Sequence, residues 1–410
     1  MTALPVSVIV VSHGRPEALV RCLMGLDQLD YPAFEIVVVA DAAGIARLSP
    51  WDGRIKQVAF DEENISAARN LGIRAAAGEI VAFVDDDAVP EPDWLARLAG
   101  GFVNDEVVAA GGYVIGRNGF SYQWQARAAA ADATTAPLEV TGDGPHLMHG
   151  KPGQAIKTEG TNMAFRREVL ATMCGFDPVY RFYLDETDLN LRIAARGGVT
   201  AIVPRARVHH GFLESHRRRA DRVPRSLFEI GASHAAFLRR HPHGQDALVL
   251  RKEEREKQRV RLLDHMVAGR LEPGDIGPLL DGFDAGWEEG AARPVMELAA
   301  IGPATAPFLP VAPRVTGGLT VLAGRTWQGR RLRAEAAARA AAGERVMLYL
   351  FAPSPRRHTR QFDPGGYWVQ SGGLFGASDR SDPVFRAWSF TSRVARERER
   401  APWTRSFAND

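Results

Sequence analysis

The sequence predicts an α/β protein in which helices flank a mostly parallel β-sheet. Over the first ninety residues, short segments rich in β-branched residues alternate with helical segments. This alternation is typical of parallel strands joined by right-handed crossovers. Residues 80–84 form an unbroken Ile-Val-Ala-Phe-Val run. A short apolar run without alternation indicates a strand covered on both faces, as strands of parallel sheets are.

The elements of this sheet follow in order along the chain. A helix is expected over residues 17–29, where apolar residues share one broad face. A second helix is expected over residues 66–77, closed by Gly78 in the left-handed conformation that often ends helices. Strands are expected at residues 6–11, 35–39, 55–60 and 80–84.

Polar residues follow three of these strands. In a parallel sheet the carboxyl ends of the strands share one edge, and ligands bind in the crevice outside it. Asn64 and Arg69, near the start of the second helix, can reach the same crevice to bind phosphate. An arginine alone is more often a surface ion-pair partner, but the acids beside Arg69 favour the binding role. The strand-end residues are Ser12, His13, Arg15, Asp41, Asp85, Asp86 and Asp87.

Three consecutive acids at the end of a buried strand repel one another, so a cation between them would stabilise the arrangement. Mg²⁺ takes one or two protein carboxylates and completes its shell with water and substrate phosphates. Side chains alternate along a strand, so Asp85 and Asp87 should point one way and Asp86 the other. The alternative is a solvated acidic turn that caps the helix near Asp93.

A second group of acids begins a later helix. Residues 185–196 are expected to be helical and to end at Gly197-Gly198, with Asp185, Glu186 and Asp188 in the first turn. The helix dipole favours negative charge there, so a purely structural role is a strong alternative. In the functional interpretation, one carboxylate faces the crevice as a general base.

Two segments flank this acidic helix. Residues 157–165 are expected to form a strand with a Gly-Thr-Asn bend, before a helix over residues 166–173. Residues 200–208 are expected to be extended, with a break at Pro204, and they lead to His209-His210. A histidine at this strand end can supply a third metal ligand, although a lone histidine is more often structural.

Five ordered motifs make residues 5–215 resemble a family 2 glycosyltransferase with the GT-A fold. The match covers about half the chain, and no single motif is specific. The sequence also departs from the family pattern. Ala40 replaces the first of two acids after the second strand, and Asp185-Glu186 reverses the usual Glu-Asp order. The motifs are residues 6–11, 64–70, 85–87, 160–167 and 185–192.

The resemblance implies a role for each matching residue. Asp85 and Asp87 would hold Mg²⁺ or Mn²⁺ together with the diphosphate of a nucleotide-sugar donor, and His209 would be a late metal ligand. Glu186, with Asp185 as its rival and Asp188 as a further candidate, would deprotonate the acceptor hydroxyl. The donor would be contacted by the remaining crevice residues, which are Ser12, His13, Arg15, Asp41, Asn64, Arg69 and Asp86.

The implied function is metal-dependent, inverting sugar transfer from a nucleotide-diphosphate donor to a hydroxyl group of a glycan or lipid-linked acceptor. Polysaccharide or glycan synthesis is the expected setting. Two alternatives use the same sheet. One is a nucleotidyltransferase with the same acidic metal site, and the other is a catalytically silent protein that binds sugar nucleotides.

Beyond the sheet, the chain divides into further regions. The transferase domain is expected over residues 1–225, with a helical extension over residues 226–302, a proline-rich linker at 303–316 and an α/β region of unknown role over 317–410. Helices are expected at residues 227–240 and 247–268, with a short helical pair at 279–298. The basic residues 211–225 form either a loop that closes over phosphates or meets an anionic lipid surface, or a solvated face.

Composition limits the remaining possibilities. The 410 residues are 45% hydrophobic and 24% charged, as in ordinary globular proteins, and the net charge of +2 gives no overall attraction to nucleic acid or membranes. Two cysteines fit a reducing compartment. No apolar run reaches the length of a membrane span, and no signal peptide is evident. We therefore expect a cytoplasmic protein without a nucleic-acid partner, and peripheral association with the inner face of the cell membrane is compatible with the sequence.

Overall fold

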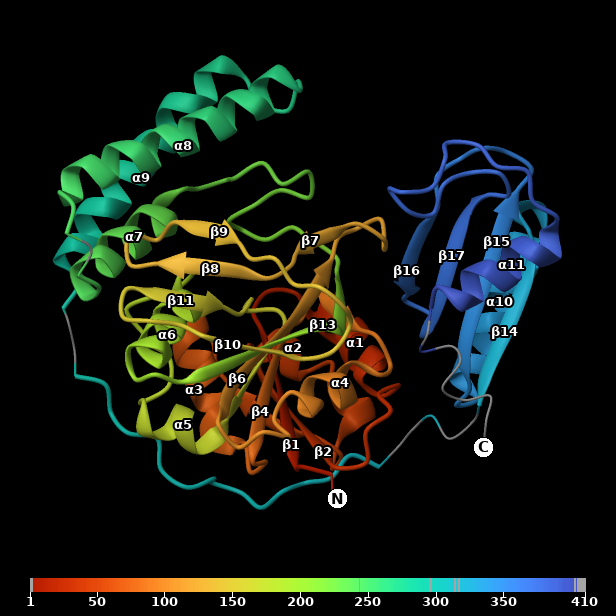
Figure 1. Ribbon diagram of the computed structural model, residues 1–410, viewed down its shortest axis with the longest axis horizontal. Coiled ribbons are helices and arrows are strands. Elements are labelled where there is room, and N and C mark those ends of the chain that lie inside the picture. Colours follow the sequence, from red (N-terminus) through yellow and green to blue (C-terminus); the bar gives the residue numbers. More distant parts are fainter. Residues whose placement is uncertain are drawn as a thin grey trace.

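A computed structural model describes residues 3–242, 244–294, 297–312, 315, 318–401 and 403. A large sheet domain, a projecting pair of helices and a smaller C-terminal sheet are arranged side by side (Figure 1). Residues 313, 314, 316 and 317 at the end of the expected linker, and the C-terminal residues 404–410, lie outside the described part of the chain.

The large sheet has ten strands in the described residues, in the order β10-β13-β6-β12-β4-β1-β2-β3, with β5 beside β13 and β7 beside β6. Strands β1, β2, β3, β4, β6 and β13 run in one direction, which confirms the predicted class of mostly parallel sheet. The strands are β1 (Val6–Ser12), β2 (Phe34–Ala40), β3 (Lys56–Ala59), β4 (Ile80–Asp85), β5 (Ala88–Pro90), β6 (Val107–Ile115), β7 (Tyr122–Trp124), β10 (His146–His149), β12 (Met163–Arg166) and β13 (Val199–His210).

Helices cover both faces of this sheet. On strand β4, Ile80, Ala82 and Val84 join one apolar cluster, whereas Val81 and Phe83 join the other. This explains why the run lacks polar alternation. One face packs against α1 (Pro16–Leu26) and α4 (Trp94–Gly100). The opposite face packs against α3 (Ile65–Ala75), α5 (Arg167–Thr172) and α6 (Asp185–Ala195), and α2 (Ala42–Ile45) and a 3₁₀ turn (Ser49–Trp51) complete the domain.

Two sequence expectations about local structure are wrong. Gly78 does not adopt the left-handed conformation, and α3 already ends at Ala75. Glycine is required at position 78 because the backbone there lies close to β1: a Cβ at this position would be 2.6 Å from the Ser7 amide nitrogen. Residues 157–165 do not form one strand, because Lys157 ends a strand of a separate three-stranded sheet. That sheet contains β8 (Arg127–Ala130), β9 (Thr135–Pro137) and β11 (Gln154–Lys157).

The helical extension contains α7 (Phe228–Arg240), α8 (Ala247–Val267) and α9 (Pro273–Ala292), which pack through Phe237, Leu262 and Phe283. The expected short pair at residues 279–298 is therefore wrong. A single helix begins earlier and contains Pro278. Among the described helices, none is long and apolar enough to cross a lipid bilayer.

The described part of the linker lies against the large sheet domain (Figure 1). The Leu309 amide donates to Glu35 at 2.8 Å, and the Val311 amide donates to the Phe34 carbonyl at 2.9 Å. These hydrogen bonds hold the linker segment against the beginning of β2.

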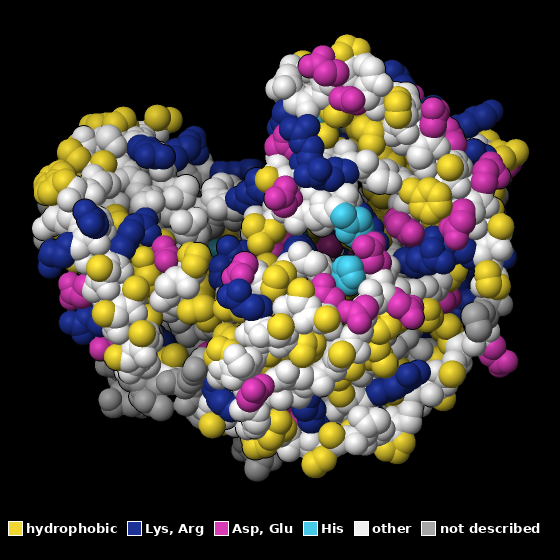
Figure 2. Space-filling model, turned by 180° about the vertical axis from the view of Figure 1, so that it is seen from behind, with side chains coloured by type: hydrophobic (Ala, Val, Ile, Leu, Met, Phe, Trp, Pro, Cys, Tyr) yellow, Lys and Arg dark blue, Asp and Glu magenta, His cyan; other side chains and the backbone are white. Residues whose placement is uncertain are grey.

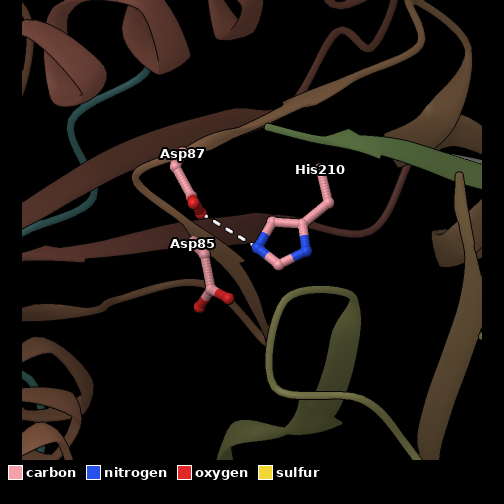
Figure 3. Close-up of side chains that lie close together, drawn as sticks. All are labelled: Asp85, Asp87 and His210. Carbon is pink, nitrogen blue, oxygen red and sulfur yellow. Dashed lines mark ion pairs between the residues drawn. The ribbon is translucent and has the colours of Figure 1, made fainter. Parts of the chain in front are cut away.

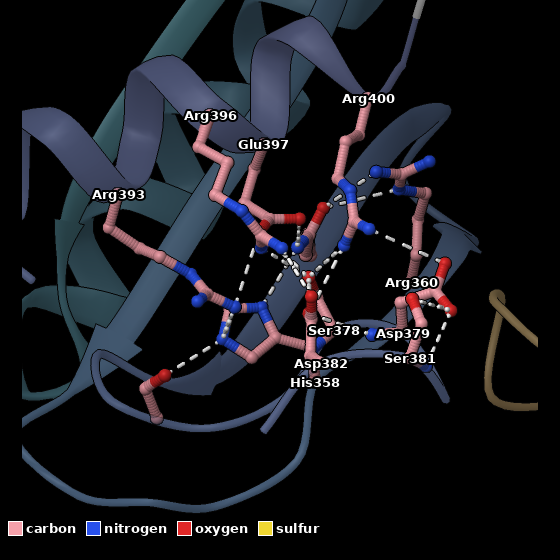
Figure 4. Close-up of polar contacts among 12 residues, drawn as sticks. His358, Arg360, Ser378, Asp379, Ser381, Asp382, Arg393, Arg396, Glu397 and Arg400 are labelled. Atoms are coloured by element: carbon pink, nitrogen blue, oxygen red, sulfur yellow. Dashed lines mark hydrogen bonds and ion pairs between the residues drawn. The ribbon is translucent and has the colours of Figure 1, made fainter. Parts of the chain in front are cut away.

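The C-terminal sheet has the order β14-β15-β17-β16 and contains one strand–helix–strand unit with parallel strands, in keeping with the expected α/β region. A buried polar network joins β17 to α11: Gln370 donates to Glu397 at 2.8 Å, and Ser378 donates to the same carboxylate at 2.8 Å (Figure 4). The elements are β14 (Leu319–Arg325), a 3₁₀ turn (Thr326–Gln328), α10 (Gly329–Ala341), β15 (Arg345–Ala352), β16 (Thr359–Asp363), β17 (Tyr367–Gly373) and α11 (Phe390–Glu399).

This C-terminal unit contacts the large sheet beside β5 and β13. Val89 of β5 belongs to the apolar cluster of the C-terminal unit, and the Trp368 ring lies 4.8 Å from the His209 ring. The Arg360 amide also donates to the Asn118 carbonyl at 2.9 Å. The two parts therefore share one buried interface.

Replacing Trp368 by alanine should lower the free energy of unfolding by about 3–5 kcal/mol, because a 1% exposed ring at this interface leaves a cavity. Chemical denaturation monitored by circular dichroism measures the loss. Trp327→Ala is the matched control, since that ring is 71% exposed and should change stability by less than about 0.5 kcal/mol. Equal effects of the two substitutions would contradict the interface.

Candidate functional site

The carboxyl ends of β1, β4 and β13 lie at the same edge of the large sheet. Val11 of β1 is in register with Asp85 of β4, and β13 ends at His210 beside β5. The structure therefore brings together the residues that follow the first and fourth predicted strands, as the parallel arrangement requires.

Asp85, Asp87 and His210 form a group suited to a metal ion. Their potential ligand atoms all lie within 4.8 Å of one another, and His210 Nε2 is 3.1 Å from Asp87 (Figure 3). Burial opposes ionisation of Asp87, but His210 and Arg15 outweigh it and lower the pKa of this carboxyl. Asp87 also accepts a hydrogen bond from the Leu213 amide at 2.9 Å.

The structure does not place His209, the metal ligand expected from the sequence, beside Asp85 and Asp87. Neighbouring residues of a strand point to opposite faces, so His209 turns away from the two aspartates. Its Nε2 lies 3.2 Å from Glu91, and its ring packs on Trp368. His210 occupies the expected position instead.

Asp86 is fully buried and, unlike Asp85 and Asp87, does not belong to the group suited to a metal ion. It accepts a hydrogen bond from Ser12 at 2.7 Å and pairs with Arg15 at 2.5 Å. Burial raises its pKa to about 7, although Arg15 acts in the opposite direction. With no exposed surface, Asp86 acts on a ligand only through the positions of Ser12 and Arg15.

A cavity of about 470 Å³ opens beside this edge. Of the predicted residues, Ser12, His13, Arg15 and Asn64 line it. Seen from behind the view of Figure 1, the surface has a hollow where histidine side chains lie among acidic and basic ones (Figure 2). The sequence did not identify several further lining residues, which include Glu62, Glu63, Trp124 and Tyr183. Arg217 and Arg218, which also line the cavity, belong to the basic segment 211–225 that the sequence singled out.

Asp41 and Asn64 both cap helices. Asp41 accepts hydrogen bonds from Gly44 at 2.7 Å and from Gly14 at 2.6 Å, so it fixes the turn after β1 without lining the cavity. The Asn64 side chain accepts from Ala67 at 3.0 Å at the start of α3. These bonds give each residue a local structural role.

Arg69 connects the Asp85–Asp87–His210 group to the start of α6. It is 3% exposed, forms a short ion pair with Asp185 and lies 3.7 Å from Asp85. It also donates to the Gly160 carbonyl at 3.1 Å. Arg69 is therefore a buried bridge between two acidic groups and not a surface ion-pair partner.

The first two acids of α6 have different environments. Burial opposes ionisation of Glu186, but a short ion pair with Lys157 outweighs it and lowers the pKa to about 2. Burial raises the pKa of Asp185 to about 7 against the effect of Arg69. Lys157 was not identified from the sequence, because only the folded chain brings the end of β11 to the start of α6.

The third acid, Asp188, lies away from the cavity and supports the structural alternative for this residue. Its side chain is fully buried and pairs with Arg192 at 2.8 Å, with His241 at 2.9 Å and with Arg240 at 3.6 Å. It thereby joins α6 to the end of α7.

Residues 7–174 match the profile of glycosyl transferase family 2. The O-antigen biosynthesis protein RfbC of Myxococcus xanthus is 27% identical over 331 residues, which cover 67% of this chain and 24% of that protein. The succinoglycan biosynthesis protein ExoM of Rhizobium meliloti is 28% identical over 255 residues, which cover 57% of this chain and 75% of that protein.

Among solved structures, the mannosyltransferase PcManGT from Pyrobaculum calidifontis, in complex with GDP-Man and Mn²⁺, aligns with a TM-score of 0.43 and 17% identity. The alignment covers 71% of this chain and 88% of that protein. This chain thus spans about a quarter of the Myxococcus protein's length and most of the length of the other two.

Asp188→Asn should lower the free energy of unfolding by about 3–5 kcal/mol, because the buried cationic partners lose their carboxylate. Burial opposes ionisation of Asp188, but Arg192, His241 and Arg240 outweigh it, so its folded pKa lies below the unfolded value of about 3.9. Its stabilisation is therefore complete above that pH and is lost as the pH falls toward the folded pKa.

Denaturant titrations of both proteins between pH 3 and pH 7 measure this difference, which should shrink at the acidic end. Asp281→Asn is the control, because Asp281 is exposed on α9. A difference that is the same at every pH would contradict the ion-pair network.

Proposed function

We propose that the chain transfers a sugar from a nucleotide-diphosphate donor to a hydroxyl group of an acceptor, as the match of residues 7–174 to glycosyl transferase family 2 suggests. The Asp85–Asp87–His210 group, at the sheet edge beside a 470 Å³ cavity, is the observation that carries this proposal. The names of the Myxococcus and Rhizobium relatives support a role in polysaccharide synthesis. Cys22 and Cys174 are both free, which supports action in the cytoplasm.

The ligand atoms of this group fit a divalent cation. Two carboxylates suit Mg²⁺ or Mn²⁺, and the imidazole nitrogen favours Mn²⁺, because Mg²⁺ prefers oxygen ligands. When bound, the ion would supply positive charge that stabilises the negative charge developing on the departing diphosphate. Arg15, 3.4 Å from Asp87, adds a fixed positive charge at the same place.

Glu186 is the proposed general base. Lys157 keeps it ionised, and an ionised carboxylate is the form that accepts a proton. The acceptor hydroxyl gives its proton to Glu186 while its oxygen attacks the anomeric carbon from the side opposite the donor phosphate. The bond from that carbon to the phosphate oxygen breaks, and its electron pair leaves with the nucleoside diphosphate. The anomeric configuration is therefore inverted.

The donor can be identified by ligand-linked thermal stabilisation with UDP, GDP, dTDP and CMP sugars in the presence of Mn²⁺. The stabilising donor is then assayed for released nucleotide and for sugar transfer. Sugar transfer supports the proposal. Formation of a nucleoside triphosphate and a sugar 1-phosphate after addition of pyrophosphate would identify a nucleotidyltransferase, and binding without turnover would identify a silent binding protein.

Glu186→Gln should reduce kcat by about 10²–10⁴-fold, because the amide cannot accept the hydroxyl proton. Donor-induced thermal stabilisation should persist. Glu168→Gln, an exposed acid at the start of α5, is the matched control and should keep wild-type turnover. Turnover near wild type in the Glu186 variant would transfer the role to Asp185, which Asp185→Asn then tests.

The two adjacent histidines provide a test of the metal site. His210→Gln should weaken Mn²⁺ binding at least tenfold, measured by calorimetric titration of the protein with Mn²⁺. His209→Gln should leave Mn²⁺ affinity within about twofold of wild type, since His209 faces Glu91 and Trp368. The reverse order of effects would refute the assignment of His210.

A further inference from the structure

We propose that the cavity contains a second anion-binding site, formed by Arg218, Arg222 and Arg261, which takes a phosphate or carboxylate group carried by the acceptor. This inference rests on the proposed sugar transfer and specifies the chemical class of its acceptor. The site adjoins the Asp85–Asp87–His210 group, where the donor diphosphate would bind, because Arg218 interacts electrostatically with Asp87.

Arginine side chains dominate the charge of the cavity lining. In the described residues, six arginines and three glutamates line it. Three of the arginines have acidic partners: Arg15 pairs with Asp86, Arg217 with Glu63, and Arg181 with Glu289. For the other three, no described carboxylate lies within ion-pair distance. They are Arg218, Arg222 and Arg261.

These three guanidinium groups also disfavour one another. Burial lowers the pKa of each, and repulsion by a second arginine of the cluster adds to it. More distant carboxylates act in the opposite direction, Asp87 on Arg218 and Glu254 on Arg261. A cluster of partly buried like charges is destabilising, and an anion bound between them would relieve the repulsion. Its presence along a cavity therefore indicates a ligand of opposite charge.

The local structure fixes two of these arginines in the basic loop of residues 211–225. Arg218 and Ser215 exchange two backbone hydrogen bonds of 2.8 and 3.1 Å. The Arg222 guanidinium lies over the Phe212 ring at 4.6 Å from its centre. The loop is thus a folded structure that presents its charges to the cavity.

The third arginine places the cluster on the acceptor side. Arg261 belongs to α8, outside the residues that match the family profile. Tyr183, which lines the cavity together with Arg261, lies two residues before the start of α6. Arg261 is therefore near the beginning of α6, where the proposed base acts on the acceptor. The proposed donor contacts Ser12 and Arg15 come instead from β1 and the turn after it.

Aromatic side chains complete this part of the cavity. Trp124, Phe182 and Tyr183 line it together with the three arginines. An apolar wall with a few charged groups is typical of sites that orient a ligand by its polar substituents. The combination suits a sugar ring or lipid-linked sugar with one negative substituent.

The test uses full-length protein saturated with Mn²⁺ and with UDP or GDP, whichever stabilises it, so that the diphosphate site is filled. Calorimetric titrations then compare octyl phosphate, octyl β-glucuronide and octyl β-glucoside. The two anionic probes should bind at least fivefold more tightly than the neutral glucoside. Preference between them shows whether the site takes a phosphate or a carboxylate.

The double variant Arg222→Gln/Arg261→Gln should abolish this preference for charged probes. Arg259→Gln is the matched control, because Arg259 lies on the same helix and pairs with Glu256 at 2.6 Å, and it should bind as wild type does. Arg261→Lys, which keeps the charge, should retain part of the preference if the double variant is unstable. Equal binding of charged and neutral probes, or equal loss in the control, would overturn the proposal.

Failure of this inference is distinguishable from failure of the proposed function. Nucleotide-linked stabilisation with Mn²⁺ should persist in every arginine variant. If it is absent in the wild-type protein, the proposed sugar transfer itself fails. If it is present while the anionic probes show no preference, only the acceptor site is refuted.

Discussion

Charge balance at the end of β4 is the constraint on which the site depends. Asp86 and Asp87 are almost completely buried there, and isolated buried carboxylates are strongly destabilising. Their compensation comes from three directions: Ser12 and Arg15 from the end of β1 and the turn after it, and His210 from the end of β13. The acids therefore hold the strand ends together at the edge of the sheet where the proposed site lies.

Arg69 extends this constraint to α6. Its buried guanidinium contacts both Asp85 and Asp185. Arg69 therefore helps to set the position of the Asp85–Asp87–His210 group relative to α6. Lys157 then fixes Glu186 from the neighbouring three-stranded sheet. The electrostatic contacts thus form a continuous chain from the end of β4 to the proposed base, and each link comes from a different part of the sequence.

Local patterns predicted most of the framework, including β1 to β4, α6 and the grouping of Asp85 with Asp87 apart from Asp86. The errors arise where tertiary structure decides. The register of β13 shifts between Val203 and Arg207, so counting alternate residues across Pro204 does not reveal which histidine faces the acids. The pairing of Lys157 with Glu186 and the enclosure of Asp188 by Arg192 and His241 depend on how separate elements pack, and no local pattern contains that information.

The C-terminal sheet packs against β5 and β13, on the side of these strands that faces away from the proposed metal site. In β13 neighbouring residues point to opposite faces, so His210 faces the proposed metal site while His209 packs on Trp368. Asp87 lies in the turn just before β5, and Val89 of β5 packs into the C-terminal unit. A change in packing at Trp368 can therefore reach His210 through its neighbour His209 in β13. The two units are thermodynamically linked, and any ligand that tightens the cleft must also make the C-terminal sheet harder to detach.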